Sequence, residues 1–510
     1  MPTTSPNPNQ RPNILLITSD QQHWNTLGLD NPEIKTPRLD ALARQGTLFT
    51  RAYCPDPTCT PSRSSIITGK YPSQHGAWSL GTRLSEKEPT VGAYLKDAGY
   101  RTALVGKAHF QPLGNTQEYP SLESYPLLQD LDYWRKFHGP FYGFDHVELA
   151  RNHTDEAHVG QHYALWLEEK GLMNWRDHFQ KPTGTRDPQR GAWSLPEKFH
   201  YNAWIAERSG ALMEESKNKQ EPFFLWASFF DPHPSYLIPE PWDKMYDPEK
   251  LTVPEAAPGE HAKNPPHFQL TQTKNPDFKP WQEKDGHWAH GFHSHLQDPK
   301  TRAENMAIYY GMTSCLDKYV GVVLDKLEAL GLADNTLVVF TTDHGHLFGQ
   351  HGLVAKGAFH YEDLIRLPFM ARYPGNVPVG KRTAAIQSLV DLAPTFLDYA
   401  GVEVPRTMSG KTQRAVWEGK KESVRDNAVV EFHHQPTTIH LRTLVDSRHK
   451  ITVYQNRDYG ELFDLENDPG ETNNLWHSAA HAALKSDLLL KLVSADLERV
   501  PMPMPRISGA

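Results

Sequence analysis

Four short and almost entirely apolar segments constrain the fold of this chain more than any other feature. They span residues 13–19, 101–105, 221–230 and 336–341. A strand with one solvent-facing side alternates polar and apolar residues, whereas a strand buried on both faces of a parallel sheet is apolar throughout. The segments therefore predict an α/β fold with a large, mainly parallel sheet at its centre.

Helix signals lie between these strand segments. Residues 36–46 begin with Thr-Pro and end with Gly, and residues 90–99 repeat the helical pattern before the second strand. Residues 302–331 form a long amphipathic helix that ends at a Gly. The alternation of strands and helices predicts a sheet sandwiched by helices. We also expect a strand over residues 47–53.

The pattern changes after about residue 420. Residues 441–454 contain two strand segments separated by a polar turn, which predicts an antiparallel hairpin. We therefore expect a large α/β domain over residues 1–420 and a smaller α+β domain, with an antiparallel sheet, over residues 421–510. Residues 111–200 and 235–300 are rich in Pro, His and Trp, and we expect loops with occasional helices there.

Composition and charge argue against several classes of protein. The 510 residues include 53 Lys and Arg against 61 Asp and Glu, so the net charge is −8 and the basic surface that binds nucleic acid is not expected. No apolar run approaches the roughly 18 residues of a membrane span, and residues 1–12 lack the features of a secretory signal. Three cysteines are too few for a disulfide framework. We expect a cytoplasmic protein with no membrane or nucleic-acid partner.

Polar side chains follow each of the four strands where it ends. Asp20 and Gln21 follow the first strand, and Asp343 and His344 follow the fourth. Ligands in open α/β sheets bind outside the carboxyl ends of the strands, so we expect these groups to converge on one crevice. Two carboxylates, an amide oxygen and one imidazole suit Ca²⁺, Mg²⁺ or Mn²⁺ better than a thiolate zinc site. The plain alternative is that each Asp caps the turn after its strand.

Residues 59–69 are the most informative segment of the chain. Pro61 and the small polar residues predict a helix that begins near Cys59 and ends near Gly69. Cys59 would then lie at the positive end of the helix, with Arg63 on the same face. A buried structural cysteine, a phosphatase-type cysteine and a Cys–His hydrolase are competing interpretations. The phosphatase type needs an Arg six residues on, where Ser65 stands, so an anion site with a nucleophile is favoured.

These residues carry a specific resemblance. CTPSR at residues 59–63, with ITGKYPSQHG at residues 67–76, resembles the signature of the type I sulfatases of the alkaline-phosphatase superfamily. Further matching motifs are PNILLITSDQ near the start, VGKAHF at residues 105–110, FFDPHPSY at residues 229–236, TTDHGHLFGQHGLVAKG at residues 341–357 and ELFDLENDPGETNNL at residues 461–475. Together they cover nearly the whole chain in the order found in the family.

The resemblance implies covalent catalysis by a modified cysteine. In the family, a formylglycine-generating enzyme converts this residue to Cα-formylglycine; one hydroxyl of the hydrated aldehyde attacks sulfur, and the other then expels sulfate. Cys59 would be that residue. It would bind one divalent cation together with Asp20, Gln21, Asp343 and His344, with Ca²⁺ as the first choice and Mn²⁺ or Mg²⁺ as alternatives.

The resemblance also implies roles for five further side chains. Arg63 would hold the formylglycine, and Lys107 and Lys356 would neutralise sulfate oxygens. His109 would assist breakdown of the covalent intermediate, and His233 would protonate the leaving oxygen. Such cations and proton donors favour the transition state because negative charge develops on that oxygen. Each residue taken alone could be an ordinary loop residue, but all lie within the matched motifs.

Two departures from the family pattern indicate a subgroup. Residues 20–21 are Asp-Gln and residues 343–344 are Asp-His, where many sulfatases have Asp-Asp and Asp-Asn, and this resembles choline sulfatases and phosphonate monoester hydrolases. Lys107 with His109 is sulfatase-like, because phosphonate hydrolases tend to lose that lysine. We expect an arylsulfatase-like sulfuric ester hydrolase acting on an aryl, choline or carbohydrate sulfate. The alternatives are a phosphonate monoester or phosphodiester hydrolase, and a non-enzymatic anion-binding protein with an unmodified thiol.

Other positions leave the substrate open. His346 stands where the family often has an acid, and Trp78 and Ser79 stand where it has an Asn. The His-rich residues 286–295 predict a loop near the pocket, with a second metal site or a lid as alternatives. Related bacterial enzymes often assemble through C-terminal extensions, so a homo-oligomer is one option for this chain.

Overall fold

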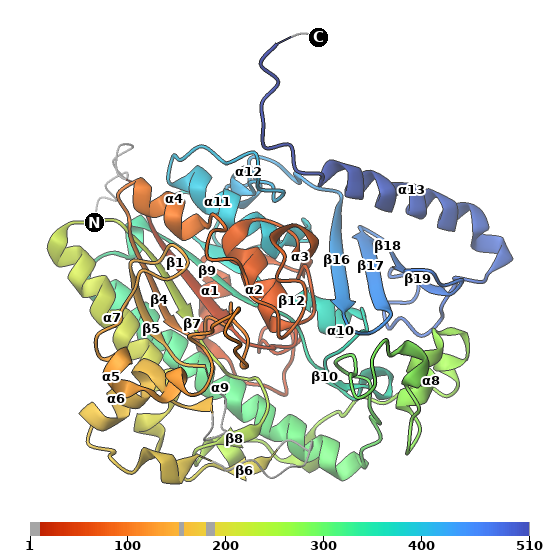
Figure 1. The fold of residues 1–510 in the computed structure, drawn as a ribbon, viewed down its shortest axis with the longest axis horizontal. Coiled ribbons are helices and arrows are strands. Elements are labelled where there is room, and N and C mark those ends of the chain that lie inside the picture. The colour runs from red at the N-terminus through yellow and green to blue at the C-terminus, as the bar shows by residue number, and fades with distance from the viewer. Residues whose placement is uncertain (1–10, 152–157, 180–188, 509–510) are drawn as a thin grey trace.

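The computed structural model describes residues 11–151, 158–179 and 189–508, and an eight-stranded sheet lies at its centre (Figure 1). In spatial order the strands are β14 (Lys381–Thr383), β2 (Thr47–Phe49), β13 (Met370–Arg372), β9 (Thr336–Thr342), β1 (Asn13–Ser19), β7 (Phe223–Ser228), β4 (Arg101–Gly106) and β5 (His146–Leu149). β13 runs antiparallel to both of its neighbours, and the other paired strands of this sheet in the described chain are parallel. The predicted fold class is confirmed.

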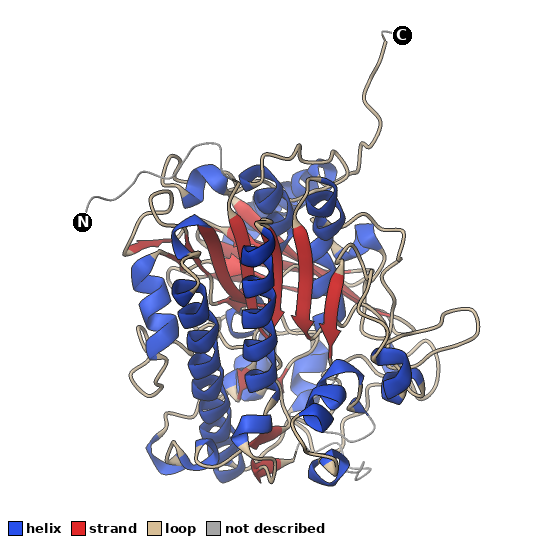
Figure 2. Ribbon diagram, turned by 90° about the vertical axis from the view of Figure 1, so that its left-hand side faces the viewer, coloured by secondary structure: helices blue, strands red, loops and turns tan. Residues whose placement is uncertain are grey.

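Helices cover both faces of this sheet (Figure 2). The helices are α1 (Pro37–Gln45), α2 (Cys59–Thr68), α3 (Pro72–His75), α4 (Val91–Asp97), α5 (Leu131–Trp134), α6 (Gln161–Glu169), α7 (Tyr201–Lys219), α8 (Pro266–Thr271), α9 (Pro299–Ala329), α10 (Glu362–Ile365), α11 (Leu392–Tyr399), α12 (Arg414–Trp417) and α13 (Ala482–Glu498). Leu15 and Ile17 of β1 pack into one apolar core with α1, α7 and α9, whereas Ile14 and Leu16 pack into a second core with α2, α4 and α11. Both faces of β1 are therefore buried, which explains its uninterrupted apolar sequence.

The C-terminal part of the chain forms a four-stranded antiparallel sheet beside the large one (Figure 1). Its strands are β16 (Asn427–His434), β17 (Ile439–Asp446), β18 (His449–Tyr454) and β19 (Gly460–Asp464), so the predicted hairpin is present. Leu488 and Leu492 of α13 pack against Leu444 and Ile451 of this sheet. The exact boundary at residue 420 stays a prediction.

The structure differs from the sequence prediction around residues 47–53. This segment forms two short strands rather than one: β2 joins the large sheet, and β3 (Ala52–Tyr53) pairs with β12 (Arg366–Leu367) and β15 (Gln387–Ser388). Between them Thr50 still bonds to the carbonyl of Thr383, while the Arg51 side chain reaches the carbonyl of Asp446. The chain therefore passes from one sheet to the next at this point.

Residues 111–200 and 235–300, where loops with occasional helices were expected, contain the helices α5, α6 and α8. They also contain three short strands that were not predicted: β5, β6 (Arg190–Ala192) and β8 (Tyr236–Ile238). The small strands β10 (Leu347–Phe348) and β11 (Val354–Ala355) lie farther along the chain. β5 lies at one edge of the large sheet and pairs with β4. The sheet therefore continues one strand beyond β4, which is one of the four strands predicted from apolar segments. Among the described residues, no helix is both long enough and apolar enough to cross a bilayer.

Candidate active site

The polar residues predicted to converge do meet at one edge of the sheet. β9, β1, β7 and β4 are consecutive parallel neighbours, so their carboxyl ends lie side by side. Asp343, Asp20 and Lys107 come directly after β9, β1 and β4, and His233 follows β7 by five residues. Asp20, Lys107 and Asp343 are completely shielded from solvent. The order of the strands in the sheet therefore brings these polar residues together.

Cys59 faces this edge from the first residue of α2. Its Sγ lies 3.1 Å from Lys356 Nζ and 3.3 Å from His344 Nε2, and 3.8 Å from Asp20 Oδ1 and 3.9 Å from Lys107 Nζ. Gly69, in the left-handed conformation (φ 65°), ends the helix as expected. The free N–H groups of its first turn and two lysines thus surround the thiol, an arrangement that suits an anion.

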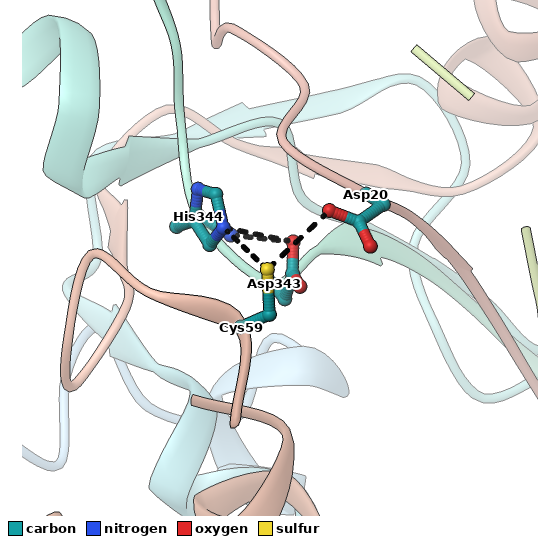
Figure 3. A group of neighbouring side chains, drawn as sticks. All are labelled: Asp20, Cys59, Asp343 and His344. Atoms are coloured by element: carbon teal, nitrogen blue, oxygen red, sulfur yellow. Dashed lines mark hydrogen bonds and ion pairs between the residues drawn. The ribbon is translucent and has the colours of Figure 1, made fainter. Parts of the chain in front are cut away.

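Asp20, Cys59, Asp343 and His344 form a buried group of metal-ligand side chains (Figure 3). One ligand atom from each residue lies within 4.8 Å of the others. Gln21 adds a fifth donor, because its Oε1 is buried and has no hydrogen-bond partner among the described residues. An orphaned carbonyl oxygen beside two carboxylates and an imidazole is what a divalent cation would satisfy. These residues therefore fit the predicted ion.

His346 holds the Gln21 side chain in this orientation. The Gln21 Nε2 amide donates to His346 Nδ1 at 2.8 Å, and His346 Nε2 lies 3.2 Å from the Tyr236 hydroxyl. Burial, with the charge of His23 as the next cause, holds the pKa of His346 well below its usual range, so the ring is neutral. With its nitrogen fixed, Gln21 presents its oxygen rather than its amide to the ligand group.

Arg63 bridges the carboxylates of Asp20 and Asp343. Its Nε donates to Asp343 Oδ2 at 2.8 Å and its second terminal nitrogen donates to Asp20 Oδ2 at 3.2 Å. Its remaining nitrogen donates to the Lys107 carbonyl at 3.0 Å and to Ser228 Oγ at 2.8 Å. The guanidinium thus ties the ends of β9, β1, β4 and β7 together while it balances the charge of the carboxylates.

The cations around Cys59 change its acidity. Burial and Asp20 act to raise the pKa of the thiol, but Lys107, Lys356 and His344 outweigh them and lower it to about 7. Burial also acts to raise the pKa of Asp20, yet Lys107 and Arg63 hold it well below its usual range. An ionised group at position 59 is therefore stabilised, as expected for a nucleophile or a metal ligand.

The two candidate acid–base histidines have different charged neighbours. His233 Nε2 is 3.2 Å from Lys356 Nζ, and burial, Lys356 and Lys107 hold the pKa of His233 well below its usual range. Burial and the positive charge of Arg151 likewise hold the pKa of His109 well below its usual range. Both imidazoles are neutral before an anion enters the site.

Comparison with known proteins assigns the family. The family model described as sulfatase matches residues 12–402, and a model of the N-sulphoglucosamine sulphohydrolase C-terminal region matches residues 349–498. The chain belongs to the type I sulfatase family. The family implies a formylglycine and a bound metal, and the buried group at Cys59 lies where both would be needed.

Several relatives match almost the whole length of this chain. An arylsulfatase of Clostridium perfringens is 29% identical over 96% of this chain and 95% of its own length. A choline-sulfatase of Rhizobium meliloti is 27% identical over 91% of this chain and 82% of its own. The phosphonate monoester hydrolase of Agrobacterium radiobacter has a similar structure, with a TM-score of 0.78, 26% identity and 97% coverage of both chains. The chain is thus a sulfatase-family hydrolase with phosphonate hydrolases among its structural relatives.

The His-rich residues 286–295 form a loop beside the active site. Gly291 packs against the backbone of Lys356 and Gly357, and Lys356 is the strongest charged neighbour of His290. His295 bonds through its ring to the Gly291 carbonyl and to the Val354 amide. The described backbone of this stretch has neither helix nor strand, as the loop prediction expects.

Two polar residues near the sulfatase site were not found from the sequence. Arg151 follows β5 at the same edge of the sheet, and its terminal nitrogen donates to Glu123 Oε2 at 2.7 Å. Both side chains are buried. The rule that ligand-binding residues follow strand ends would have found Arg151 had the short strand β5 been recognised.

Proposed function

We propose that this protein hydrolyses sulfate monoesters, with Cys59 converted to Cα-formylglycine and one divalent cation bound beside it. The observation that carries the proposal is the position of Cys59 Sγ, within 4 Å of two buried lysines and of two metal-ligand side chains. We propose Ca²⁺ as the ion because most of the donors are oxygens, with Mn²⁺ and Mg²⁺ as the alternatives that metal analysis would separate.

The chain's own residues would bind and orient the ester. Lys107 Nζ and Lys356 Nζ lie 3.9 Å and 3.1 Å from Cys59 Sγ and would hold the sulfate oxygens with fixed positive charge, which costs no reorganisation during the reaction. Arg63 would keep the Asp20 and Asp343 carboxylates turned toward the ion. The formylglycine and its ion supply the nucleophilic oxygen.

Two histidines would move protons. His233, beside Lys356, would donate from Nε2 to the leaving oxygen once the ester's negative charge offsets the two lysines. His109 is neutral and would accept a proton in the later step that releases sulfate. In this proposal His233 acts as the leaving group departs, and His109 acts after it.

A phosphonate monoester hydrolase is the second candidate. The Asp-Gln and Asp-His pairs and the TM-score of 0.78 to such an enzyme favour it. The presence of Lys107, fully buried and paired with Asp20, favours the sulfatase, because phosphonate hydrolases tend to lose that lysine.

The test uses protein produced with a formylglycine-generating enzyme and shown by mass spectrometry to be modified. We expect kcat/KM for p-nitrophenyl sulfate to exceed that for a p-nitrophenyl phosphonate monoester by about tenfold or more, which is 1.4 kcal/mol of transition-state preference. A preference of that size for the phosphonate would reverse the order of the two candidates.

A further inference from the structure

Lys356 reaches the active site without the support of an ion pair. Its Nζ lies 3.1 Å from Cys59 Sγ. Lys107 and Arg63 are each paired with the Asp20 carboxylate, whereas among the described residues no carboxylate lies within ion-pair distance of Lys356 Nζ. A lysine ammonium is carried on a flexible four-carbon stem. The place of this charge beside Cys59 therefore depends on the backbone that carries the side chain.

That backbone belongs to a short and strained hairpin. β10 and β11 have two residues each and pair Leu347 with Ala355 and Phe348 with Val354, and Lys356 follows directly. Ala355 has a φ of 62°, in the left-handed region that a residue with a Cβ adopts only at a cost in free energy. A two-stranded hairpin is marginally stable by itself. The segment therefore needs contacts from elsewhere in the chain to hold Lys356 in place.

His295, at the end of the His-rich residues 286–295, supplies such a contact. Its side chain is buried, its Nδ1 accepts a hydrogen bond from the Val354 amide at 3.0 Å, and its Nε2 lies 2.7 Å from the Gly291 carbonyl oxygen. Burial and the charge of His293 lower the pKa of His295 to about 3, so the ring is neutral. A neutral ring that accepts at Nδ1 carries its hydrogen on Nε2 and donates it to that carbonyl. The ring therefore bridges Gly291 and Val354 with both of its nitrogens.

Gly291 in turn lies against the backbone of Lys356 and Gly357. A methyl group at Gly291 would lie 2.8 Å from Gly357 Cα and 2.9 Å from the Lys356 carbonyl oxygen, and one at Gly357 would lie 2.8 Å from Gly291 Cα. A carbon atom does not fit at such distances, so two glycines are needed where these backbones cross. The His-rich loop thus contacts the chain before Lys356 through the His295 ring and directly after it through Gly291.

We propose that His295 is a positioning residue: by tying Gly291 to Val354, it fixes the backbone from which Lys356 reaches a sulfate ester at Cys59. The inference rests on the proposed function, because it concerns how one of the two sulfate-binding lysines is held. His295 does not contact the ester in this proposal and acts only through Lys356. The His-rich loop then serves the reaction as a support for Lys356 and not as a second metal site.

The experiment uses metal-loaded protein that carries formylglycine, with p-nitrophenyl sulfate as the substrate and inorganic sulfate as a competitive inhibitor. His295→Phe keeps a flat ring beside Phe359 but removes both hydrogen bonds. We expect it to lower kcat/KM about tenfold and to raise Ki for sulfate by about the same factor, because both constants report on the anion held by Lys356. His295→Gln has an acceptor and a donor in one side chain and is expected to restore most of the loss.

A double-mutant cycle with Lys356→Ala separates positioning from a general structural role. If His295 acts through Lys356, His295→Phe changes kcat/KM by less than about twofold once Lys356 has been replaced. His287→Phe is the matched control, because His287 is an exposed histidine of the same loop, and it is expected to change kcat/KM and Ki by less than about twofold.

Circular dichroism and metal content after dialysis are measured for each variant and are expected to match the unchanged protein, since neither His295 nor Lys356 belongs to the metal-ligand group. If His295→Phe does not fold, His295→Asn takes its place in the cycle. The shorter side chain keeps an acceptor for the Val354 amide and does not reach the Gly291 carbonyl.

The outcomes separate this inference from the proposed function. A loss confined to protein that retains Lys356 supports the inference. Equal losses with and without Lys356 would overturn it, and so would an unchanged Ki for sulfate in folded His295→Phe; in both cases the proposed function stands. If the modified protein without substitutions hydrolyses no sulfate ester, the proposed function fails instead.

Discussion

Replacing His233 by Ala tests whether this residue protonates the leaving oxygen. His233 Nε2 lies 3.2 Å from Lys356 Nζ, which in turn lies 3.1 Å from Cys59 Sγ, so the imidazole borders the reacting atoms without touching the thiol. A positioned general acid contributes roughly 10²- to 10⁴-fold in rate. That range applies to leaving groups that need a proton.

The surroundings of His233 determine how large a loss of rate we expect within that range. Burial, Lys356 and Lys107 hold its pKa well below the usual range, so the imidazole donates only when the bound anion offsets the lysines. We therefore expect the lower end, a loss of about 10²-fold in kcat/KM, or about 2.7 kcal/mol, for a sugar or alkyl sulfate. For p-nitrophenyl sulfate, whose leaving group departs without a proton, we expect a loss of less than about fivefold.

The assay measures kcat/KM over a series of aryl and alkyl sulfates of rising leaving-group pKa. The slope of log kcat/KM against that pKa is expected to be steeper for His233→Ala than for the unchanged protein. His109→Ala is the matched control: it is expected to lower kcat while it leaves the slope of kcat/KM unchanged, because it acts after the leaving group has departed. Parallel lines for His233→Ala and the unchanged protein would refute the assignment.

Three further predictions concern a metal-ligand residue, the nucleophile and the buried His360. Asp343→Asn removes one carboxylate ligand and the partner of Arg63, so bound metal measured after dialysis is expected to fall by more than about tenfold, together with kcat; unchanged metal and rate would contradict the site. Cys59→Ala is expected to abolish turnover and to lower Tm by no more than about 3 °C, as calorimetry would show, since only the small functional group at position 59 is lost. Burial and Lys450 lower the pKa of His360 to about 3, below the value of about 6.5 in the unfolded chain, so its contribution is complete above pH 6.5 and is lost as the pH falls toward 3. In His360→Gln the fall in unfolding free energy from pH 7 to pH 5 is expected to be smaller by about 2 kcal/mol, and an equal fall would count against this linkage.

The sequence predicted the parts of the fold that depend on strongly periodic segments. β1, β7, β4 and β9 are long and buried on both faces, so their apolar runs stand out, and their order places Asp20 and Asp343 side by side. Short strands contain too few residues to show a recognisable pattern of apolar side chains. β5 has four residues and β2 has three, and their pairing is decided by neighbours distant in the chain.

The ligand group was easier to predict than the surroundings of the substrate. Asp20, Asp343 and His344 directly follow predicted strands, so a rule about strand ends finds them. Arg151 and Glu123 meet although 28 positions separate them in the chain, and Trp78 is held by His433 from the other sheet. Such contacts depend on how loops fold over the sheet, which local sequence patterns do not encode.

Mass spectrometry of the peptide spanning residues 52–63 examines the chemical basis of the mechanism most directly. Trypsin releases this peptide after Arg51 and Arg63, and it contains Cys54 as well as Cys59, so fragment ions report on each position separately. In active protein we predict a loss of about 18 Da at position 59, from replacement of the thiol by an aldehyde, with Cys54 unchanged. Fully active protein with an intact thiol at position 59 would contradict the account.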